Sequence, residues 1–234
     1  MAEAPPVHVP VATLDDTSRA DFLVRVYQHL LAAIVGFVAI EALLINLGFA
    51  RAMYDWLDGN GYMWLAVLGG FMVGSWIATN AAHDILEPSR QYAGLFGLAA
   101  LYAVLFAPFL HYVFDVQSGG SATVGAAAII TAFGFAGLTA VGLTTRTDLS
   151  YLRPLVLWGF VGALLLIVAG VLFGFELGIW FSVGMIVLAG ASILYQTQSI
   201  MRRYPSEAYV GAAVQLFASV MLLFWYVLRL VSQR

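Results

Sequence analysis

The chain has 234 residues, of which 62% are hydrophobic and only 10% are charged, with a formal net charge of −3. Soluble domains are roughly 45–50% apolar and about 25% charged, and a fold of this size still exposes roughly a quarter to a third of its surface. A water-soluble protein is therefore excluded, and the lipid bilayer is the predicted surrounding.

The absence of cysteine excludes disulfides and thiolate sites, and the ten basic residues form no block that would bind nucleic acid.

The chain starts with a polar segment, residues 1–21, that is rich in proline and lacks the pattern of a signal peptide. We predict that it is a disordered cytoplasmic tail, and that residues 22–234 form one transmembrane domain. About 20 helical residues cross roughly 30 Å of hydrocarbon, so seven apolar segments predict an all-α membrane protein, a bundle of about seven transmembrane helices. The segments are Leu23–Phe49, Met63–Ala82, Tyr92–Tyr112, Thr123–Thr145, Leu155–Phe173, Ile179–Ile200 and Tyr209–Leu230.

The placement of arginine predicts the orientation of these helices. The break between the fifth and sixth segments, at Gly174 and Glu176, is the shortest connection, and without it the topology would change. With a cytoplasmic N-terminus, seven arginines lie on the cytoplasmic side and three on the other, as the positive-inside rule requires. The seven are Arg19, Arg25, Arg90, Arg146, Arg153, Arg202 and Arg203, and the three are Arg51, Arg229 and Arg234. The C-terminus is then predicted on the opposite side.

A single carboxyl group, Glu41, interrupts the first apolar segment within FVAIEALLINL. A charge inside hydrocarbon costs from about 2.5 to 10 kcal/mol or more, so this residue needs an explanation. It is either an intramembrane proton or cation site, or a neutral acid that hydrogen-bonds to a neighbouring helix. No basic residue at the same depth decides between these interpretations.

A second polar set lies on the sixth and seventh segments. Its members are Ser192, Gln196, Gln198 and Ser199 on the sixth, and Gln215 and Ser219 on the seventh. Because a short loop joins the two helices, Gln196 and Ser219 can face each other, either as a functional pair or as ordinary interhelical hydrogen bonds worth about 0.6 kcal/mol each. Neither a metalloprotease motif nor a nucleophile elbow occurs, so we predict no enzyme, no catalytic residue, no metal site and no cofactor.

Four segments together resemble the Bax inhibitor-1 family. These are FLVRVYQHL from Phe22, TTRTDLSYLRPLV from Thr144, ILYQTQSIM at the end of the sixth helix, and AAVQLFASVMLLFWYVLRLV in the seventh. The third is similar to the family's Tyr-Asp-Thr-Gln motif, and the likeness extends from about Phe22 to Val231. The resemblance implies a compact seven-helix fold in which the other helices enclose the last one.

The resemblance also implies a set of functions. Family members suppress cell death in eukaryotes and leak calcium in a pH-sensitive way, and some bacterial relatives restrain a membrane-anchored ATP-dependent protease. The leak is attributed to two aspartates that share a proton. Here Gln196 and Ser219 stand at those positions, and Leu222 replaces the asparagine of the last motif. Glutamine and serine hold no titratable proton near neutral pH, so the calcium mechanism is expected to be absent or greatly altered, with a neutral hydrogen bond in its place.

The leading hypothesis is a bacterial inner-membrane protein that regulates a membrane protease or a stress response through protein contacts. The alternative is a pH-dependent leak for Ca²⁺, H⁺ or another cation that uses Glu41.

Overall fold

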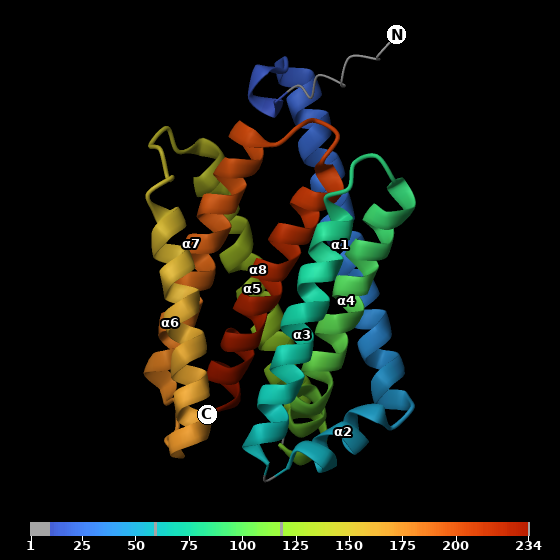
Figure 1. The fold of residues 1–234 in the computed structure, drawn as a ribbon, viewed down its shortest axis with the longest axis vertical. Coiled ribbons are helices and arrows are strands. Elements are labelled where there is room, and N and C mark those ends of the chain that lie inside the picture. Colours follow the sequence, from blue (N-terminus) through green and yellow to red (C-terminus); the bar gives the residue numbers. More distant parts are fainter. Residues whose placement is uncertain (1–9, 59, 118, 234) are drawn as a thin grey trace.

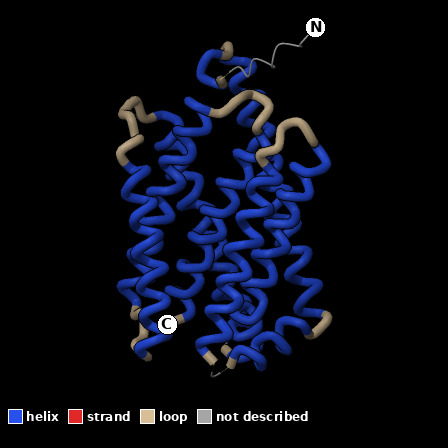
Figure 2. The backbone as a smooth tube through the Cα atoms, in the orientation of Figure 1, coloured by secondary structure: helices blue, strands red, loops and turns tan. Residues whose placement is uncertain are grey.

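The computed structural model describes residues 10–58, 60–117 and 119–233 as a bundle of helices (Figures 1 and 2). Within these residues, seven helices are long and apolar enough to cross a membrane, which confirms the predicted fold class. They are α1 (Asp16–Asn46), α3 (Gly61–Ala82), α4 (Pro88–His111), α5 (Gly120–Thr144), α6 (Leu152–Phe173), α7 (Ile179–Arg203) and α8 (Tyr209–Ser232). Shorter elements are the 3-10 turn η1 (Val11–Thr13), the helix α2 (Phe49–Leu57) and the π-helical turn η2 (Tyr112–Val116).

The N-terminal segment differs from the disordered tail predicted over residues 1–21, of which residues 1–9 lie outside the described part. Residues 10–21 contain the turn η1 and the start of α1. The Val11 side chain is fully buried, and its backbone N–H donates to the carbonyl oxygen of Tyr204 at 2.9 Å. Asp15 then caps α1, because its carboxylate accepts from the backbone N–H groups of Thr17 and Ser18 at 3.1 Å. The order of this segment depends on one buried valine and one helix cap, and neither changes its polar, proline-rich composition enough to be predicted from it.

Two glycines set the breaks between helices. Gly48 has φ +73° and separates α1 from α2, and Gly174 has φ +71° and ends α6. This left-handed region favours glycine because it has no Cβ. The break predicted at Gly174 is therefore present, whereas α2 was not predicted. That helix buries Ala50 and Leu57 and exposes Trp56, so its two faces differ.

Helix α8 is the enclosed helix of the bundle. Of its most apolar 18-residue window, 72% is buried, against 50% or less for each of the other six spans. It contacts α1, α3, α4, α5 and α7, and Phe217 and Leu228 on it are fully buried. The structure thus has the enclosed last helix that the resemblance implied. The polar groups on α8 are therefore surrounded mainly by other helices.

Candidate functional site

Three neutral side chains join α7 to α8 in the middle of the bundle. The Ser219 hydroxyl donates to Oε1 of Gln196 at 2.9 Å, and the Gln196 amide donates to Oγ of Ser192 at 3.0 Å. The hydroxyl oxygens of Ser192 and Ser219 lie 3.1 Å apart. If Ser192 donates to Ser219, each of the three groups donates once and accepts once. We refer to Ser192, Gln196 and Ser219 as the neutral latch.

The sequence explains why these groups meet. Ser192 and Gln196 are four residues apart on α7 and therefore lie on one face, and α7 packs against α8 across a short turn. Ser192 and Ser219 are buried, and Gln196 is half-buried. The structure thus brings Gln196 and Ser219 together, as their positions in the sequence led us to expect. None of the three titrates near neutral pH, so the latch holds the helices together without a proton-dependent charge.

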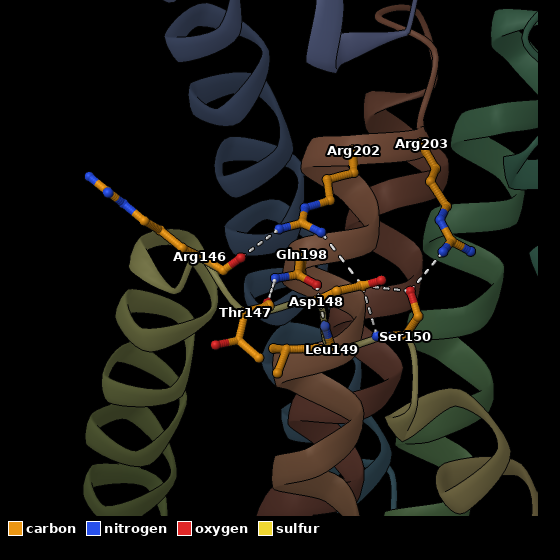
Figure 3. A network of polar contacts seen from close by, with 8 residues as sticks. All are labelled: Arg146, Thr147, Asp148, Leu149, Ser150, Gln198, Arg202 and Arg203. Carbon is orange, nitrogen blue, oxygen red and sulfur yellow. Dashed lines mark hydrogen bonds and ion pairs between the residues drawn. The ribbon is translucent and has the colours of Figure 1, made fainter.

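Gln198 lies apart from the latch, on α7, where its side chain faces the loop between α5 and α6 (Figure 3). Its side-chain oxygen accepts from the backbone N–H of Leu149 at 2.7 Å, and its amide donates to the carbonyl oxygen of Thr147 at 2.7 Å. The glutamine thereby mimics a backbone partner for both residues. These two bonds hold the loop against α7. Gln198 therefore supports the loop and does not contact the latch.

Charged residues at the end of α7 reinforce this loop (Figure 3). The Asp148 carboxylate accepts from the hydroxyl of Ser150 at 2.7 Å and from its backbone N–H at 3.0 Å, and Arg202 lies 3.5 Å away. These hydrogen bonds and the nearby arginines lower the pKa of Asp148. Arg203 donates to the Ser150 hydroxyl at 2.9 Å. Sequence reasoning missed this network, although its loop lies in the TTRTDLS segment that carried the family resemblance.

Replacing Gln198 with methionine should release this loop. The change removes two hydrogen bonds of a buried side chain, each worth about 1 kcal/mol, so the open state of the loop should become about tenfold or more populated. We expect trypsin to cleave after Arg146 at least tenfold faster in detergent-solubilised protein. Ser199→Ala is the matched control, because Ser199 is the next residue and makes neither of these bonds. Equal cleavage rates in the two variants would contradict the role of Gln198 in holding this loop to α7.

Gln215 also lies outside the neutral latch. Its side chain lies near the hydroxyl of Tyr204 in the turn between α7 and α8, and Nε2 of His83 lies 3.4 Å from the same hydroxyl. Burial raises the pKa of Tyr204 to about 12, so the phenol keeps its proton. Because the Tyr204 carbonyl also accepts from Val11, this residue ties the N-terminal segment to the bundle.

Glu41 is buried without a hydrogen-bond partner. Its side chain is 5% exposed, and neither carboxyl oxygen meets a donor among the described residues. The structure therefore brings it neither to a basic residue nor to an interhelical hydrogen bond. Across the described residues, no group of three or more His, Cys, Asp or Glu side chains gathers to hold a metal ion.

The depth of Glu41 is close to that of the latch. The rings of His29 on α1 and Tyr209 on α8 lie 5.0 Å apart, and the two packed helices run in the same direction (Figure 1). At 1.5 Å per residue, Glu41 lies about 18 Å beyond His29, and Ser219 about 15 Å beyond Tyr209. The acid and the latch are thus at similar depth, although α1 and α7 contact α8 separately.

Comparison with known proteins gives two matches. A family model described as "Inhibitor of apoptosis-promoting Bax1" matches residues 19–234, which is almost the whole chain. A Pseudomonas aeruginosa protein named "Uncharacterized protein PA2604" is 34% identical over 132 residues, which are 55% of this chain and 58% of that protein. The match thus spans less than two thirds of this relative.

Proposed function

Because the chain belongs to the Bax inhibitor-1 family, we propose that it regulates a membrane-anchored ATP-dependent protease, and through it a stress response, by direct protein contact. It catalyses no reaction itself in this proposal. It lies in the inner membrane of a bacterium, with the N-terminal end of α1 on the cytoplasmic side. The bacterial relative and the excess of arginine at that end of the bundle support this location and orientation.

The neutral latch is the observation that carries the proposal. In a pH-gated leak, two carboxylates at this place would separate α7 from α8 as they lose their shared proton. Here a closed set of hydrogen bonds of 2.9–3.1 Å among uncharged groups holds the two helices at any pH near neutral. A bundle that stays closed acts through its surfaces, and this favours protein contact over pH-gated conduction.

The outer face of α5 supports a contact within the membrane. Gly125 has open space around it, and Ala132, Ala136 and Ala140, which follow it on the same side of the helix, are exposed. Small residues let a second transmembrane helix approach closely, which is how helices associate in lipid. We therefore propose that the transmembrane anchor of the protease packs against this face of α5.

Cross-linking in native membranes tests the proposal. After mild cross-linking and purification of the tagged full chain, a membrane-anchored ATP-dependent protease should be enriched at least tenfold over an unrelated multi-pass protein. Gly125→Leu should lower this enrichment at least fivefold, because the added side chain occupies the α5 face. Gly162→Leu on α6 is the matched control, since an added side chain there also meets open space. Recovery of no partner above background would count against the function, and equal recovery with Gly125→Leu would count against α5 as the contact.

A second function, a cation leak through the bundle, is favoured by one observation, the unpaired carboxyl of Glu41 at the depth of the latch. Without such a function, an unpaired carboxyl group in hydrocarbon would only lower the stability of the fold. A pH-dependent flux in proteoliposomes that Glu41→Gln abolishes would favour this alternative over the regulator.

A further inference from the structure

A cleft of about 970 Å³ opens on the side of the bundle between α3 and α6, which touch at Gly61 and Val171 and stand apart beyond that point. Figure 1 shows α8 behind the space between these two helices. Its floor is aromatic and comes from α4 and α8, with Phe106, Phe109 and Trp225. Its walls are mostly aliphatic, with Leu68 of α3 and Leu164 of α6, and they also include Phe71 and Phe160. We call this space the α3–α6 cleft.

The cleft reaches the outer surface of the bundle. Met72 on α3 and Leu157 on α6 both line it, and they are 49% and 60% exposed. In a membrane this surface faces acyl chains. Water finds few hydrogen-bonding partners in a space with so few polar groups. An apolar group from the membrane is therefore the chemically matched occupant.

The length of the cleft corresponds to one leaflet. Its lining runs from Gly61 to Met72 on α3 and from Leu157 to Val171 on α6, and 11 and 14 steps of 1.5 Å make about 16 and 21 Å. The hydrocarbon of a bilayer is roughly 30 Å thick, so one leaflet spans about half of that. A single acyl chain that enters from the side, between α3 and α6, would thus fill the cleft while its headgroup stays at the end near Gly61.

The charged groups of the cleft lie at that same end. Arg229, in the last turn of α8, is half-buried in its lining. One of its guanidinium N–H groups donates to the carbonyl oxygen of Leu177 at 2.9 Å. Arg229 forms no salt bridge within residues 10–58, 60–117 and 119–233. A guanidinium with free donors is the preferred partner of a phosphate group. Asn60 and the exposed Asp58 stand at this end too, and offer acceptors to a headgroup.

We propose that the α3–α6 cleft binds a phospholipid of the leaflet at the C-terminal end of α8. One acyl chain occupies the cleft, and the phosphate accepts hydrogen bonds from Arg229. The match has three parts, namely an apolar lining, the length of one leaflet and an unpaired cation at the headgroup end. It stands independently of the proposed regulatory function.

Native mass spectrometry of the delipidated protein in detergent tests this proposal. Dioleoyl phosphatidylglycerol and dioleoyl phosphatidylethanolamine should each add one molecule per chain, with binding at least tenfold tighter than that of dioleoylglycerol, which lacks the phosphate. Arg229→Gln should weaken binding of both phospholipids at least tenfold. Arg51→Gln is the matched control, because it removes the same charge at the same end of the bundle, outside the lining of the cleft.

A second variant tests the acyl chain separately. Leu68→Trp puts a larger side chain into the wall of the cleft and should lower phospholipid binding at least fivefold while Arg229 is intact. Equal binding of dioleoylglycerol, or undiminished binding by Arg229→Gln, would overturn the phosphate contact. Undiminished binding by Leu68→Trp, or no stoichiometric binding to the native chain, would overturn the cleft as the place of the lipid.

Discussion

A variant with both Gln196→Asp and Ser219→Asp should conduct Ca²⁺ as the pH rises, whereas the native chain should not. The two native groups touch at 2.9 Å, so the new carboxyl groups would lie within a few Å of each other. Two charges at 4 Å repel by about 4 kcal/mol at an effective dielectric constant of 20. At acidic pH the pair shares a proton and the contact between α7 and α8 stays closed. When the pH rises and the proton leaves, the repulsion drives the helices apart.

Calcium uptake into proteoliposomes across a series of pH values measures this change. The matched control replaces the same residues without charge, as Gln196→Asn with Ser219→Asn, and should show no uptake at any pH. A pH-gated uptake by the native chain would contradict the neutral latch as the reason for a closed bundle. Uptake by neither chain would show that the scaffold lacks a conducting path even with the carboxylates restored.

Replacing Glu41 with methionine should stabilise the protein by about 1–3 kcal/mol. Methionine fills a similar space, and the change removes two buried oxygens that have no donor, each of which costs free energy in the fold. Thermal unfolding in detergent measures the difference, and the midpoint should rise. Leu44→Met, at a half-buried position one turn along α1, is the control and should change stability by less than about 1.5 kcal/mol.

The opposite sign would be equally informative. A loss of stability in Glu41→Met, together with a flux that Glu41→Gln abolishes, would favour the cation leak. A gain in stability with no change in protease recovery would leave Glu41 outside the regulatory function.

The fold could be predicted from the sequence because lipid imposes a simple rule. A span must satisfy its own backbone hydrogen bonds, which a helix does, and it must be long and apolar, so hydropathy alone indicated seven helices. The helix ends were less predictable, since they depend on single contacts. The Asp15 cap and the φ of Gly48 decide where α1 begins and ends, and neither changes the composition of a window.

The polar groups could be predicted in part. Gln196 and Ser219 were found because they interrupt apolar helices at positions of a known motif. Gln198, two residues from Gln196, lies on another face of α7, and its loop partners are backbone groups some 50 residues away. Every residue has these backbone groups, so no sequence pattern shows which of them Gln198 will bind. The α3–α6 cleft was missed for a related reason, since it is a space between helices that are distant in the sequence.

Enclosure of α8 has a consequence for the order in which the molecule is made. A ribosome delivers the helices from the N-terminus, so α1, α4 and α5 enter the membrane before the helix against which they all pack. Until α8 is translated, these helices lack their central partner, and the six-helix intermediate has no finished interior. Assembly of the bundle is therefore completed only near the end of synthesis, when α8 moves between helices already inserted in lipid.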